Sequence, residues 1–153
     1  MKEYIKSMRK LVGKRPILQC GASVIAVNEK NEILLQLRKD NNCWAYAGGA
    51  VEIDEIVEEA AKRELFEETG LRANKLDLFG VFSGPELHYT YPNGDEVSNI
   101  EILYICKDYT GELIPQLDEV LELKFFPIDD IPENLSPPVV KGMKAYIAFC
   151  KRL

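Results

Sequence analysis

One stretch of this 153-residue chain decides how the remainder is interpreted: GAVEIDE at residues 49–55, followed after seven further residues by RELFEETGL at 63–71. Between residues 54 and 69 the apolar and charged side chains alternate with the spacing of a helix. Asp54 is a suitable N-terminal cap, and Gly70 is a suitable C-terminal stop. The sequence therefore predicts a helix over residues 54–69.

The expected helix carries glutamates on the side that should pack against the rest of the protein. At about 100° per residue, one third of its circumference holds six residues: Val57, Ala60, Ala61, Glu64, Glu67 and Glu68. A solvated acidic face is the ordinary interpretation of a glutamate-rich helix. Here, however, the carboxylates repel one another, pay for desolvation and lie near the negative end of the helix dipole. A cation would offset all three costs, and clustered oxygens suit Mg²⁺, with Mn²⁺ as a possible substitute.

A glycine pair just before this stretch, Gly48-Gly49, allows the backbone to approach a ligand closely. From Gly49 to Leu71 the chain reads G-x5-E-x7-R-E-U-x-E-E-x-G-U, where U is aliphatic. This resembles the Nudix box at every defined position, and weaker resemblance extends over residues 18–132. Two departures from the common family pattern are Ala47, where many members have proline, and Asp54, where many have glycine.

The fold that this resemblance implies is an α/β/α sandwich with a mixed β-sheet, with the box helix packed on the sheet. We expect a single domain over residues 1–153, because no linker divides the chain. Strands are predicted at 19–27, 33–38, 76–83, 88–91, 98–107 and 121–126, with a turn at 92–95. An amphipathic helix over residues 3–12, in a basic segment 1–15, and a closing helix over 136–153 complete the pattern.

The chemistry that the resemblance implies is hydrolysis of a pyrophosphate link in a nucleoside diphosphate joined to another group. Glu64, Glu67, Glu68 and the carbonyl of Gly48 would hold one to three Mg²⁺ ions. Arg63 would pair with the box carboxylates and fix their orientation, and Glu55 would act similarly near the start of the helix. A simple surface ion pair between Arg63 and Glu55 remains an alternative.

Further site residues are expected outside the box. Family members often recruit one more acid from a loop, and Glu119 is our first choice and Glu122 our second. The expected substrate-binding residues are Arg38, Trp44, Tyr46, Gly49 and Glu52. Aromatic side chains at such positions are more often part of the core, so the sequence does not name the substrate.

Three function classes stay open: a MutT-like nucleoside triphosphate pyrophosphohydrolase, which we favour; a hydrolase of ADP-ribose, sugar nucleotides or dinucleoside polyphosphates; and a module that senses a nucleotide without turnover. The net charge of −6 disfavours a stable nucleic-acid partner. No apolar run is long enough to span a membrane. Four widely spaced cysteines suit buried or half-buried thiols in a reducing cytoplasm. Monomer and homodimer are both compatible with the sequence.

Overall fold

The computed structural model describes residues 3–152. Residues 1 and 2 of the basic N-terminal segment and residue 153 of the expected closing helix lie outside the described part. Its helices are α1 (Glu3–Val12), α2 (Val57–Thr69) and α3 (Val140–Lys151). Its strands are β1 (Ile17–Ala26), β2 (Ile33–Arg38), β3 (Trp44–Ala45), β4 (Ala47–Ala50), β5 (Arg72–Phe82), β6 (His88–Thr90), β7 (Glu96–Thr110) and β8 (Val120–Phe126).

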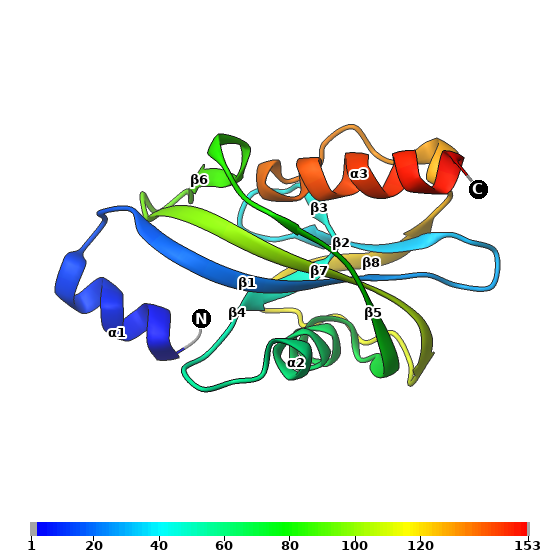
Figure 1. Ribbon diagram of the computed structural model, residues 1–153, viewed down its shortest axis with the longest axis horizontal. Coiled ribbons are helices and arrows are strands. Elements are labelled where there is room, and N and C mark those ends of the chain that lie inside the picture. Colours follow the sequence, from blue (N-terminus) through cyan, green and yellow to red (C-terminus); the bar gives the residue numbers. More distant parts are fainter. Residues whose placement is uncertain (1–2, 153) are drawn as a thin grey trace.

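The strands form two sheets. The larger has the order β4-β1-β7-β5, with β6 also paired to β7, and the smaller has the order β3-β2-β8. Strands β1 and β7 run parallel over ten residue pairs, while the other pairs are antiparallel. Figure 1 shows α2 on one side of the strands and α3 on the other, with α1 beyond one end. The expected mixed sheet between helical layers is therefore observed.

Two apolar layers join the helices to the strands. Ala60, Ala61 and Leu65 of α2 pack against small residues of β1 and against Leu34 of β2. On the opposite side, Met143 of α3 belongs to a separate buried cluster with residues of β1, β2 and β7. A third, smaller cluster seats α1 through Ile5 at the end of β1 and β4. The sheets thus fix α2 firmly, and α2 carries the glutamates of the box.

Two expected helix starts were wrong, and the glycine pair lies in a strand that was not predicted. Helix α2 begins at Val57 rather than at Asp54, which instead adopts a left-handed backbone conformation with φ of 62°. The glycine pair lies inside β4, where Gly48 and Gly49 pair with Ser23 and Ala22. The closing helix begins at Val140, because residues 137–139 form a separate 3₁₀ turn that starts with two prolines.

The structure also bears on the expected turn, on the cysteines and on membrane-spanning segments. The turn at 92–95 does connect two paired strands, β6 and β7. All four cysteines are free thiols, but Cys20 is exposed rather than buried or half-buried. Within residues 3–152, no helix is both long enough and apolar enough to cross a membrane.

The end of α2 yields a first prediction about stability. Gly70 has φ of 83°, and a Cβ there would lie 2.4 Å from the carbonyl oxygen of Glu112. Gly70→Ala should lower the free energy of unfolding by more than the ~1 kcal/mol expected for alanine in this conformation alone. Urea unfolding measures the loss. Gly13→Ala is the matched control, since Gly13 has φ of 64° and no atom near the added Cβ. Equal losses in the two variants would contradict the predicted clash.

Candidate active site

Two carboxylates lie buried on the inner face of α2. Glu64 is 2% exposed and Glu68 is 5% exposed, and they stand one helical turn apart. Strand β4 makes room for the first of them: a Cβ on Gly49 would lie 2.5 Å from the Cδ of Glu64. The glycine pair therefore serves a close approach between strand and carboxylate, rather than the turn that a Gly-Gly pair usually marks.

Glu68 is held by two donors from different strands. The backbone N–H of Gly48 donates to Glu68 Oε1 at 2.8 Å, and Gln36 Nε2 donates to the same oxygen at 3.2 Å. Burial, and next the nearby charge of Glu64, raise the pKa of Glu68 to about 8. Two buried acids this close make the site a strong attractor for positive charge.

Arg63 connects the start of the helix to these carboxylates. It forms a two-pronged ion pair with Glu55, at 2.7 and 2.8 Å, and its Nη1 donates to Glu64 Oε1 at 2.8 Å. It also donates to the carbonyl of Ala50 at 3.2 Å. The expected pairing of Arg63 with box carboxylates is thus present, and it includes the expected partner Glu55.

The third glutamate of the expected stripe is placed differently. The side chain of Glu67 is 38% exposed, and its Oε2 lies 3.5 Å from Arg63 Nη1. Glu67 does not line the cavity that opens beside Glu64 and Glu68. The expectation of one buried stripe was wrong for Glu67, because its angle on the helix sets it at the rim.

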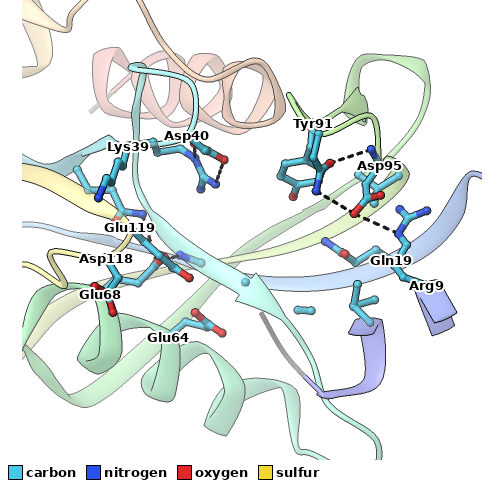
Figure 2. Close-up of a pocket in the computed structure, with 18 residues that line it drawn as sticks. Arg9, Gln19, Lys39, Asp40, Glu64, Glu68, Tyr91, Asp95, Asp118 and Glu119 are labelled. Carbon is cyan, nitrogen blue, oxygen red and sulfur yellow. Dashed lines mark hydrogen bonds and ion pairs between the residues drawn. The ribbon is translucent and has the colours of Figure 1, made fainter. Parts of the chain in front are cut away.

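A cavity of about 500 Å³ opens beside Glu64 and Glu68. Its walls come from α1, β1, β2, β4, the turn between β6 and β7, and the residues preceding β8. Figure 2 shows Glu64, Glu68, Asp118 and Glu119 gathered in one part of this cavity, with Arg9, Gln19, Tyr91 and Asp95 in another. The acidic part has the character of a cation site, and the other part offers amide, phenol and guanidinium groups.

Some of the remaining expected residues line the cavity, and others lie outside it. Gly48, Gly49 and Arg38 line the cavity, and Arg38 forms a two-pronged ion pair with Asp40, at 3.0 and 2.8 Å. Glu119 also lines it, whereas Glu122, which lies in β8 opposite Leu37 of β2, does not.

The two aromatic residues and Glu52 lie outside this cavity. Trp44 packs edge-on against Phe126. Tyr46 is 2% exposed and donates through its hydroxyl to Glu101 at 2.8 Å, in a smaller adjacent pocket. Glu52 accepts a hydrogen bond from the backbone N–H of Tyr4 and thereby ties α1 to the loop before α2.

Several residues of the cavity escaped the sequence analysis. They come from elements far from the box and are Arg9, Gln19, Gln36, Lys39 and Asp40. Only Gln36 left a signal in the sequence: it is a polar residue in the apolar run 33–37 and lies two positions before Arg38, so both share one face of β2.

The acidic part of the cavity fits a hard cation with few protein ligands. Among residues 3–152, no three Asp, Glu, His or Cys side chains are arranged to hold a metal ion by themselves. The buried donors present are all oxygens, from Glu64 and Glu68, and the buried Oε1 of Gln36 adds an oxygen without a protein partner in that part of the chain. Mg²⁺ and Mn²⁺ suit such a set, since they keep several waters and share ligands with substrate phosphates.

The contact between Gly49 and Glu64 generates a second prediction. Gly49→Ala should push the carboxylate of Glu64 aside and weaken Mn²⁺ binding by about 10-fold or more, as measured by calorimetry. Gly21→Ala is the matched control in the neighbouring strand, because its Cβ would meet only an ordinary contact at 3.5 Å. Similar affinities for the two variants would show that the close approach does not matter.

The raised pKa of Glu68 generates a third prediction, for the metal-free protein. Between about pH 4.5 and 8 the folded chain binds more protons than the unfolded chain, so the free energy of unfolding should fall as pH rises. Glu68→Gln should flatten this fall. Glu101, whose pKa burial raises to about 7, contributes with the same sign in both proteins. Urea unfolding in EDTA across this range gives the slopes, and identical slopes would refute the assignment.

Comparisons with known proteins identify the family of this chain. The NUDIX domain family matches residues 18–148. An ADP-ribose pyrophosphatase of Methanocaldococcus jannaschii is 38% identical over 136 residues, which cover 86% of this chain and 76% of that protein. A putative 8-oxo-dGTP diphosphatase of Bacillus subtilis is 47% identical over 66 residues, only 43% of this chain and 44% of that protein.

A solved structure extends the agreement to the fold. The crystal structure of a MutT NUDIX hydrolase from Burkholderia pseudomallei superposes with a TM-score of 0.72, at 26% identity, over 84% of this chain and 98% of that one. The mixed α/β architecture expected from the sequence is confirmed by this likeness. With the family match over most of its length, the chain belongs to the NUDIX domain family.

Proposed function

We propose that this protein hydrolyses the diphosphate bond of a nucleoside diphosphate derivative, with ADP-ribose as its preferred substrate, in the presence of Mg²⁺. The observation that carries the proposal is the pair of buried carboxylates, Glu64 and Glu68, that opens into a cavity also lined by Arg38. Such a pair is costly unless a cation binds it, and a diphosphate is the substrate group that shares such a cation.

Within this proposal, each residue has a distinct task. Glu64 and Glu68 hold the cation together with the carbonyl of Gly48, and Glu67 approaches from the rim. The bound cation would neutralise the diphosphate and lower the pKa of an attacking water. Arg63 fixes the orientation of Glu64 through its ion pairs. Arg38 faces the diphosphate, and Glu119 accepts the proton of the attacking water.

The choice of ADP-ribose rests on two observations. The relative named an ADP-ribose pyrophosphatase matches this chain over 86% of its length, whereas the relative named an 8-oxo-dGTP diphosphatase matches over 43%. The cavity of about 500 Å³ also extends away from the carboxylates to α1 and the β6–β7 turn. It therefore offers room for groups on both sides of a diphosphate.

A nucleoside triphosphate remains the second candidate, and it is the one that the sequence alone favours. Its support is the likeness to the MutT NUDIX hydrolase structure at 26% identity. A module that only senses nucleotides is less well supported, because every carboxylate of the box is present.

The fourth prediction separates these candidates. With Mg²⁺, ADP-ribose should be cleaved to AMP and ribose 5-phosphate, with kcat/KM higher by about 10²-fold or more than for nucleoside triphosphates or dinucleoside polyphosphates. Chromatography of the nucleotide products measures each rate. Glu68→Gln should reduce kcat by orders of magnitude. It should leave the metal-free fold intact, because a neutral amide replaces a carboxyl group whose neutral form burial already favours.

Other outcomes would redirect the assignment. Preference for a triphosphate would select the second candidate. Nucleotide binding without turnover of any substrate would select the sensing module. An active Glu68→Gln variant would show that the buried pair is not the cation site.

A further inference from the structure

Gln36 is a buried polar side chain in an apolar strand. It is 2% exposed and lies in β2 between Leu35 and Leu37. Its carboxamide nitrogen donates to Glu68 Oε1 at 3.2 Å. Its carboxamide oxygen is fully buried and has no protein donor among residues 3–152. Because a buried acceptor without a donor is costly, this oxygen requires an explanation.

The location of this oxygen is informative. Two other buried side-chain atoms of the described residues lack a hydrogen-bond partner, Arg9 Nε and Glu52 Oε2, and both belong to the region where α1 is anchored. Gln36, in contrast, lines the same cavity as Glu64 and Glu68. The side chain that carries the unsatisfied oxygen therefore borders the cavity and contacts Glu68.

The orientation of the carboxamide is set by Glu68. Glu68 Oε1 already accepts the N–H of Gly48 at 2.8 Å, and Gln36 Nε2 supplies its second donor. Once Glu68 is ionised, as cation binding requires, turning the carboxamide over would bring its oxygen against a carboxylate oxygen and place two acceptors together. The nitrogen thus faces Glu68, and the oxygen is left without a donor from residues 3–152.

A water carried by a divalent cation would supply the missing donor. Mg²⁺ and Mn²⁺ retain waters when bound by few carboxylates, and these waters donate strongly. Hydrogen bonds from protein groups to the ligands of a metal orient those ligands and raise its affinity. Gln36 is placed to do both, since one side chain reaches Glu68 and also presents an acceptor.

We propose that Gln36 is a positioning residue of the cation site: its Nε2 fixes the carboxylate of Glu68, and its Oε1 accepts a hydrogen bond from a water bound to the cation. This inference rests on the proposed function, which supplies the cation. It adds to the carboxylates of the box a residue from a strand that lies outside it.

The test is Gln36→Leu, which keeps the approximate volume and removes both polar atoms. The dissociation constant for Mn²⁺ alone, measured from the electron paramagnetic resonance signal of free Mn²⁺, should rise about 10- to 100-fold. The melting temperature in EDTA should stay the same or increase, because the unsatisfied acceptor is gone. Gln36→Met repeats the measurement with a more flexible side chain.

The matched control is Gln19→Leu, another glutamine of the cavity, whose Nε2 donates to Asn99 at 3.1 Å rather than to a carboxylate of the box. It should bind Mn²⁺ as tightly as the wild type. An unchanged Mn²⁺ affinity in Gln36→Leu or Gln36→Met, with or without a lower melting temperature, would reduce Gln36 to a structural role and overturn the inference alone. A wild-type protein that fails to bind Mn²⁺ would instead overturn the proposed function as well.

Discussion

The burial of two acids one turn apart on the same helix is the constraint that the surrounding structure meets. Glu64 and Glu68 repel each other and lose solvation, and the result is a raised pKa for Glu68. Strand β4 accommodates both acids: Gly49, which has no side chain, leaves space for Glu64, and the backbone N–H of Gly48 donates to Glu68. The small residues of α2 and β1 bring helix and sheet close enough for these contacts.

Local sequence was sufficient to predict the end of α2 and its buried glutamates, because both depend on spacing within one helix. The start of the helix was predicted incorrectly, since the loop before it is shaped by a distant ion pair between Glu55 and Arg63 rather than by a cap at Asp54. The position of Glu67 was misjudged because a residue at the edge of a helical stripe becomes buried or exposed according to its neighbours.

The far side of the cavity could not be predicted, since it is assembled from pieces that only tertiary structure brings together. Arg9 of α1 donates to the carbonyl of Glu96, and its Nε lies 3.8 Å from a carboxylate oxygen of Asp95. These contacts join the first helix to the β6–β7 turn. The N-terminal helix is thus a wall of the cavity, whereas its sequence shows only an amphipathic pattern. Cation chemistry and ligand selection consequently depend on different parts of the chain.

The loop over residues 51–56 is closed by a single guanidinium. Arg63 binds the carbonyl of Ala50 just before the loop and both carboxylate oxygens of Glu55 near its end, while Ile53 and Ile56 are exposed. Exposed side chains between the two anchors, such as Ile53, are therefore free to vary, but the number of residues is not. One residue added or removed would separate the anchors from the arginine that joins them. The spacing in the motif therefore reflects the fixed length of this loop. Relatives should differ in its exposed side chains and agree in its number of residues.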